Sequence, residues 1–180
     1  VSAMSIVPAG SYTIDTAHSQ VGFTARHAMV TKVRGAFDEF DGNATVGADL
    51  ADSTVNVSIK AASVNTRNEQ RDAHLVSGDF LDVEAFPTLT FTSTKVEQAD
   101  DGLKITGDLT IKDVTRPITI PFSYEGAATD PFGNERVGFE GSVVVNRKDW
   151  DLTWNAALET GGVLVSDKVT LEFEVAAVKA

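Results

Sequence analysis

The sequence predicts an all-β protein: an eight-stranded antiparallel up-and-down barrel with one short helix. From Leu103 to Ile111, apolar residues or glycine occupy every second position and polar residues lie between them. This two-residue period is typical of a strand with one buried and one solvated face, and it recurs along most of the chain. Connections such as 100–102 and 112–115 are short and carry turn residues, which favours hairpins over helical crossovers. A meander that closes on itself satisfies both observations.

The alternation defines eight strands, with ends that such patterns locate to within about 2–4 residues. We predict them at residues 12–16, 32–47, 53–61, 88–98, 102–112, 115–128, 135–147 and 167–178. On one face they carry branched and aromatic side chains, and on the other Ser, Thr, Asn and Glu.

One segment departs from the two-residue period. Thr66 is followed three residues later by Glu69, a capping box that predicts a helix opening after Thr66 and running through about Leu75. Gly78 is a suitable stop, and residues 77–83 favour a further short turn. Residues 127–134 read as a hairpin tip.

Composition limits the class of protein. A chain of 180 residues that is 42% hydrophobic fits one domain, which we place at residues 12–180 after a flexible segment 1–11. A net charge of −11 repels nucleic acid and anionic membrane surfaces as a whole. There is no cysteine, and no apolar run long enough to predict a membrane span. We expect a cytoplasmic protein, or a secreted or periplasmic one if a signal peptide has been removed.

An eight-stranded barrel can be filled by its own side chains or can hold one small apolar ligand. Small residues at inward positions, namely Gly107, Gly141, Ala44 and Ala61, remove volume that a packed core would need. Strand glycines also permit tight bends at barrel corners. The pattern alone therefore leaves both a cavity and a filled core open.

Several sequence blocks resemble the YceI-like lipid-binding proteins. They follow the family's order and span nearly the whole chain: YTIDTAHSQVGF at 12–23, GAFDEFDG at 35–42, RDAHL at 71–75, DFLDV at 79–83, FP at 86–87, GDLTI at 107–111, VTRP at 114–117 and NRKDW at 146–150. Three positions depart from the usual pattern, because Asp113, Asp151 and Ser166 stand where the family commonly has glycine.

The resemblance implies a lipocalin-like barrel whose long pore holds an amphiphile with a polyisoprenoid or other long aliphatic tail, such as an isoprenoid quinone. It also implies a binding protein rather than an enzyme, and a possible homodimer. We expect no cofactor beyond a bound isoprenoid-type lipid. The candidate lining residues are Phe23, Phe37, Val57, Ile59, Phe80, Phe91, Leu109, Ile111, Ile120, Phe122, Phe139, Val143 and Trp154.

A phosphate-bearing headgroup would require cations near the mouth of the pore. Arg26, Arg67 and Arg71 lie in or beside the segments outside the predicted strands, so we select them as candidates. Arg71 has an alternative role, because its neighbours Asp72 and His74 favour a structural network that ties the helix to the barrel.

Two other function classes remain as alternatives. An enzyme acting on an amphiphile in the same pore would use His18 or His74 as acid or base. A structural or interaction domain would have a filled barrel. The three histidines match no metal-ligand spacing, and no Gly-x-Ser-x-Gly elbow is present. We therefore assign no catalytic residue and no metal ligand.

Overall fold

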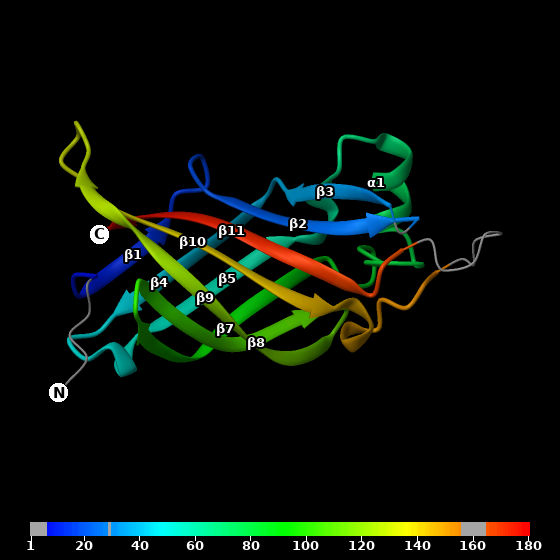
Figure 1. The fold of residues 1–180 in the computed structure, drawn as a ribbon. Helices are drawn as coiled ribbons and strands as arrows, with labels where there is room; N and C mark the ends of the chain where they lie inside the picture. The colour runs from blue at the N-terminus through cyan, green and yellow to red at the C-terminus, as the bar shows by residue number, and fades with distance from the viewer. Residues whose placement is uncertain (1–6, 29, 156–164) are drawn as a thin grey trace.

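The computed structural model describes residues 7–28, 30–155 and 165–180. It is mostly strand, with one α-helix and three short 3₁₀ turns (Figure 1). The elements are β1 (Gly10–Ile14), β2 (Gln20–His27), β3 (Thr31–Phe37), β4 (Phe40–Val46), η1 (Leu50–Asp52), β5 (Thr54–Lys60), η2 (Ala61–Ser63), β6 (Val64–Asn65), α1 (Glu69–Val76), β7 (Thr88–Ala99), β8 (Gly102–Ile111), β9 (Val114–Thr129), β10 (Glu135–Asn146), η3 (Arg147–Trp150) and β11 (Lys168–Lys179).

Eight strands close the barrel. They follow the order β1, β4, β5, β7, β8, β9, β10 and β11, and pairing of β11 with β1 completes the ring. Every one of these pairings is antiparallel. The predicted eight-stranded antiparallel barrel with one short helix is therefore confirmed.

Two positions in the barrel are each occupied by two strands that lie end to end. Along β11, residues 177–179 pair with β1 and residues 170–174 pair with β2. In the same way, β4 pairs with β1 while β3 pairs with β2. The predicted strand 32–47 is broken at Asp38 and Glu39, and the prediction of 12–16 missed the continuation in β2. Alternation of Val21 and Phe23 with polar residues or glycine is the signal that could have shown it.

The ordered part of the barrel begins before residue 12. Val7 is only 3% exposed, and β1 starts at Gly10. Residues 7–11 therefore belong to the folded domain and not to a flexible terminal segment, while residues 1–6 lie outside the described part of the chain.

The junction between β1 and β2 is held by side chains. The Asp15 carboxylate accepts from the backbone N–H of Ala17 and contacts the His18 ring and the Arg136 guanidinium. Across the gap, the Ser19 hydroxyl accepts from the N–H of Ala176 at 2.9 Å and donates to its carbonyl at 3.2 Å. These groups replace the ladder bonds lost where the strand is interrupted, as buried backbone groups require.

Arg136 on β10 bridges two carboxylates. It pairs with Asp15 at the junction and with Asp130 in the β9–β10 turn. The hydrogen bond from Arg136 is the main cause that lowers the pKa of Asp15 to about 2, and the hydrogen bond with His18 is the second. Arg136 is also the main cause that lowers the pKa of Asp130 to about 2, ahead of the hydrogen bond from the N–H of Asn134. Both carboxylates therefore remain charged well below the pH at which an ordinary Asp is protonated.

The predicted helix is present and lies at one end of the barrel (Figure 1), but it begins at Glu69, two residues later than a capping box at Thr66 implies. Its N-cap is Asn68, whose side-chain oxygen accepts from the N–H of Arg71. Thr66 instead donates its hydroxyl to Asp72 at 2.6 Å and accepts from Arg71 Nε at 2.8 Å. Thr66 is thus a link between the chain before the helix and its first turns, and the capping-box assignment was wrong.

The inward glycines are covered by aromatic rings on neighbouring strands. A Cβ at Gly107 would lie 2.6 Å from Cζ of Phe91 and 2.6 Å from the carbonyl oxygen of Thr92. A Cβ at Gly141 would lie 2.6 Å from Cδ1 of Phe122. These two glycines therefore accommodate rings, and the interpretation that they leave open volume was wrong.

We expect Gly107→Ala to lower the free energy of unfolding by about 1–3 kcal/mol, because the methyl group would overlap a ring and a backbone carbonyl that cannot both withdraw. The control is Gly78→Ala, which meets no heavy atom within 4 Å and should change stability by less than about 0.5 kcal/mol. Urea unfolding of both variants measures the difference. Equal stability of the two would contradict the packing described here.

We expect Arg136→Gln to destabilise the protein at neutral pH by an amount that shrinks as the pH falls. The depressed pKa values mean that the charged carboxylates stabilise the fold above pH about 4, and that this contribution is lost as the pH falls through about 2. Urea unfolding over that range, with Lys104→Gln as the control for charge, tests this. A gap between wild type and Arg136→Gln that stays constant with pH would refute it.

Candidate functional site

The barrel encloses an apolar cavity in the half that lies away from α1. Its volume is about 160 Å³, counted as the space that the centre of a water molecule can reach. All eight barrel strands contribute to its wall, together with Val7, and with Leu50 of η1, which is 2% exposed. The barrel strands therefore surround the cavity on its sides, and η1 contributes to the wall near one end.

The structure places seven of the thirteen predicted lining residues on this wall: Val57, Ile59, Phe91, Leu109, Ile120, Phe122 and Phe139. Of the four small residues, Ala44 lines the cavity, whereas Ala61 is fully buried away from it. Sequence reasoning missed other wall residues, which include Val7, Tyr12, Leu50, Val96, Val137 and Phe173.

The other six predicted lining residues, Phe23, Phe37, Phe80, Ile111, Val143 and Trp154, are not on the cavity wall. They lie in the half of the molecule nearer α1, where side chains contact one another. The rings of Phe23 and Phe37 are 5.8 Å apart between centroids, and those of Phe80 and Trp154 are 5.3 Å apart. This cavity therefore does not reach the six residues, and on the α1 side aromatic rings contact one another instead.

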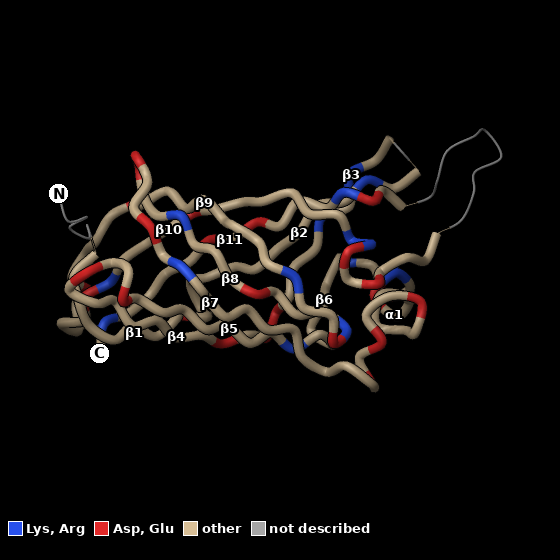
Figure 2. The backbone as a smooth tube through the Cα atoms, turned by 90° about the horizontal axis from the view of Figure 1, so that it is seen from below, with Lys and Arg blue, Asp and Glu red and all other residues tan. Residues whose placement is uncertain are grey.

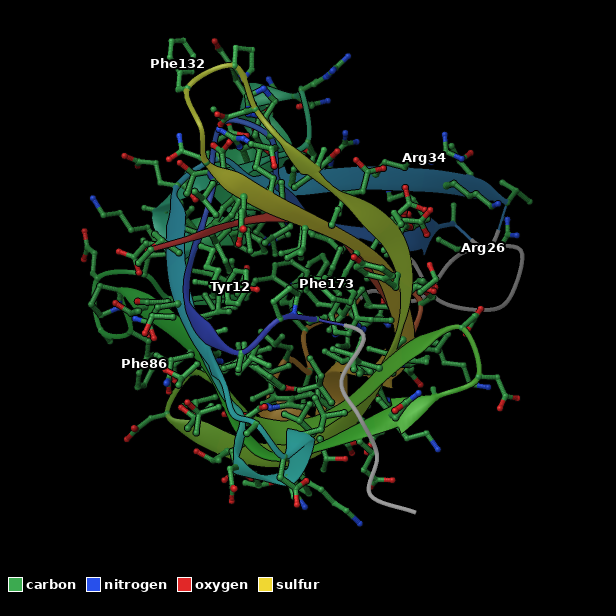
Figure 3. The ribbon with its side chains drawn as sticks, turned by 90° about the vertical axis from the view of Figure 1, so that its left-hand side faces the viewer. Tyr12, Arg26, Arg34, Phe86, Phe132 and Phe173 are labelled. Atoms are coloured by element: carbon green, nitrogen blue, oxygen red, sulfur yellow. The ribbon has the colours of Figure 1, made fainter. Side chains whose placement is uncertain are left out.

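Tyr12 marks the end of the cavity near the N-terminal segment. Figure 3 looks along the barrel from this end and shows Tyr12 and Phe173 near its middle. The Tyr12 hydroxyl donates to the carbonyl of Pro8 at 2.7 Å, and burial is the main cause that raises the pKa of the phenol. Tyr12 therefore stays neutral and fastens the segment that contains Val7 against the barrel.

Two serine hydroxyls on the wall are already bonded to the protein. Ser19 is bonded to the backbone of Ala176, and the Ser53 hydroxyl accepts from the N–H of Gly47. Among the described residues, no buried side-chain nitrogen or oxygen lacks a hydrogen-bond partner. The buried part of the wall therefore favours apolar groups, because its polar side-chain atoms already have partners in the protein.

The three predicted headgroup cations lie outside the cavity wall. Arg26 is exposed on β2, and Arg67 is exposed just before α1. Arg71 donates to both the hydroxyl and the carbonyl of Thr66, so it joins the network with Asp72 that its sequence context favoured. The structure thus brings none of them to the cavity, and contact with a headgroup stays a prediction.

The histidines form separate pairs with carboxylates. His18 bonds to Asp15, and His74 bonds to Asp79 at 2.9 Å while its ring packs edge-on against Trp154. Within residues 7–28, 30–155 and 165–180, no three His, Asp or Glu residues group in a way suited to a metal ion. None of the helices in this part of the chain has the length and apolar character of a membrane span.

Comparison with known proteins matches both the sequence and the barrel. The model of the YceI-like domain family matches residues 12–177. A UPF0312 protein of Staphylococcus aureus is 39% identical over 166 residues, covering 90% of this chain and 94% of the relative.

Solved structures share the barrel. BcnA of Burkholderia cenocepacia aligns with a TM-score of 0.79 at 22% identity, covering 91% of this chain and 98% of that one. A YceI protein of Campylobacter jejuni aligns with a TM-score of 0.73 at 31% identity, covering 86% and 90%. A polyisoprenoid binding domain from Saccharophagus degradans aligns with a TM-score of 0.70 at 15% identity, covering 94% and 98%. From its sequence and its barrel, this chain belongs to the YceI-like family.

Proposed function

We propose that this protein binds a long-chain amphiphilic lipid by holding its isoprenoid-type tail in the barrel cavity, and that it carries or sequesters this lipid without changing it chemically. The observation that carries the proposal is the apolar cavity, whose buried polar side-chain atoms are already bonded to the protein. The polyisoprenoid binding domain with the same fold supports this ligand class.

The tail supplies most of the expected affinity. Burial contributes about 0.8 kcal/mol for each methylene group, whereas an exposed ion pair to a headgroup contributes about 0–1 kcal/mol. A wall of aliphatic and aromatic groups discriminates weakly between tails that differ by one methylene. We therefore expect selection by the length and branching of the tail more than by the headgroup.

The geometry supports carriage over catalysis. The two histidines that an enzyme would use, His18 and His74, are both absent from the cavity wall. Tyr12 does line the cavity, but its hydroxyl is bonded to Pro8 and its raised pKa disfavours the phenolate that a base would need. Glu174 is the carboxylate among the lining residues, and it is an exposed residue on β11.

We expect the purified protein to retain a lipid with an isoprenoid-type tail. Mass spectrometry of an organic extract measures it directly, and protein stripped of lipid should bind geranylgeraniol, detected by a rise in melting temperature. Absence of lipid from extracts, together with no shift on adding geranylgeraniol, would overturn the proposal. A chemically altered alcohol recovered after incubation would favour the enzyme.

We expect Ala44→Trp to reduce lipid retention more than about tenfold, because an indole inside the cavity displaces at least two methylene groups of the ligand. Ala85→Trp, at an exposed turn, is the matched control and should retain lipid normally. Thermal unfolding of each variant checks folding. Val57→Phe adds less volume and serves as a second cavity variant if Ala44→Trp fails to fold. Unchanged retention in a folded cavity variant would place the ligand elsewhere.

A further inference from the structure

The segment 16–37 differs in charge from the rest of the chain. It contains no Asp or Glu, although the whole sequence has 26, and it contains Arg26, Lys32 and Arg34. In the structure this segment includes β2 and β3, which form a hairpin at the end of the barrel that also carries α1 (Figure 1). Figure 2 shows blue segments gathered on β3, in contrast to the scattered charges of the barrel. The hairpin is thus a basic element on an acidic protein.

The strand register puts the three cations on one face of the hairpin. Arg26 is directly opposite Lys32, and Thr24 is opposite Arg34. Side chains opposite each other, and those two residues apart, share a face of an antiparallel pair. All three cations are exposed, and Figure 3 shows Arg26 and Arg34 directed away from the barrel interior. Phe23 occupies the other face, where it packs against Phe37.

These cations are available to an external anion. Within the described part of the chain, none of the three lies within 4.0 Å of a carboxylate, whereas Arg136, for example, pairs with two. On the same face, Glu172 and Glu174 of β11 line a shallow pocket with Arg34, and Glu172 accepts a hydrogen bond from Thr24. Arg26 and Lys32, which lie opposite each other nearer the turn, do not line that pocket, so the positive charge is concentrated toward the turn.

The hairpin also presents an apolar residue and is held firmly in place. Val30, in the turn, is 78% exposed. The backbone of Arg26 is fixed at both its groups: its N–H donates to the hydroxyl of Ser166, and its carbonyl accepts from the N–H of Ser166. An exposed apolar side chain beside a cluster of cations is the combination by which surface elements bind anionic lipid bilayers.

We propose that the β2–β3 hairpin docks this protein on the surface of an anionic lipid bilayer. Arg26, Lys32 and Arg34 contact the headgroup phosphates, and Val30 enters the interfacial layer. The net charge of −11 does not prevent this, because charges farther away than about 8 Å are largely screened at physiological ionic strength. The acidic barrel then points away from the membrane, which fixes the orientation of the bound protein. This inference does not depend on what the cavity holds.

Vesicle co-sedimentation tests the proposal with the full chain. We expect binding to phosphatidylcholine vesicles that contain phosphatidylglycerol, little binding to phosphatidylcholine alone, and loss of binding at high salt. Each cation near such a surface strengthens binding about fivefold, so the triple variant Arg26→Gln, Lys32→Gln and Arg34→Gln should bind about 100-fold more weakly. Val30→Ser should weaken binding further without changing the salt dependence.

The matched control has the same change in net charge on other surfaces. It combines Lys60→Gln, Lys95→Gln and Lys104→Gln, all at exposed positions, and should bind vesicles like wild type. Equal loss in both triple variants would overturn the proposal, as would wild-type binding that is absent or insensitive to phosphatidylglycerol. Equally tight binding to duplex DNA would also overturn it, because the hairpin would then be a general polyanion site. Retention of lipid in the cavity, measured on the same samples, reports separately on the proposed function.

Discussion

Closure of the sheet through β1 and β11 is the constraint on which the rest of the structure depends. Without it, the inward faces of all eight strands would border solvent, and two sheet edges would present unpaired backbone groups. Only three residue pairs join β1 to β11 before the strand is interrupted. The interruption is tolerated because the side chains of Asp15 and Ser19 accept hydrogen bonds from the backbone N–H groups of Ala17 and Ala176 at the junction. This accounts physically for the polar residues between two apolar stretches near the start of the chain.

The interior divides because ring placement differs between the two ends. In the half nearer α1, aromatic side chains pack in pairs, Phe23 against Phe37 and Phe80 against Trp154. Toward η1, the wall is made mostly of aliphatic side chains that line the space without filling it. Phe91 and Phe122 lie against glycines on adjacent strands, which draws their rings toward the sheet. The cavity thus depends on the positions of the aromatic rings, and Gly107 and Gly141 contribute because the rings of Phe91 and Phe122 lie against them.

Much of the barrel could be predicted from the sequence, because alternation along single strands such as β8 is a local property. The junction of β1 with β2 could not, since its stability comes from Ala176 and Arg136, which are distant in sequence. Two departures from the family pattern have a local explanation. Asp113 and Asp151 have φ values of 63° and 62°, a region that favours glycine but that aspartate tolerates.

The candidate site was predicted only in part, for a related reason. Inward orientation follows from strand period, and the structure places seven of the thirteen predicted residues on the cavity wall. Whether an inward side chain borders a cavity or packs against another side chain depends on its partners across the barrel, which alternation does not specify. Val7 and Leu50 lie outside the predicted strands, and only the tertiary fold brings them to the cavity. The cations were selected for lying outside strands, and that criterion does not determine which end of the barrel they reach.

The strands that lie end to end, β1 with β2 and β4 with β3, give the barrel two sections, while β10 and β11 run through both. One section therefore contains β1 and β4 and the other contains β2 and β3, and the two sections share the long strands. Substitutions on the wall near η1 therefore reshape the cavity and leave the ring contacts beside α1 in place.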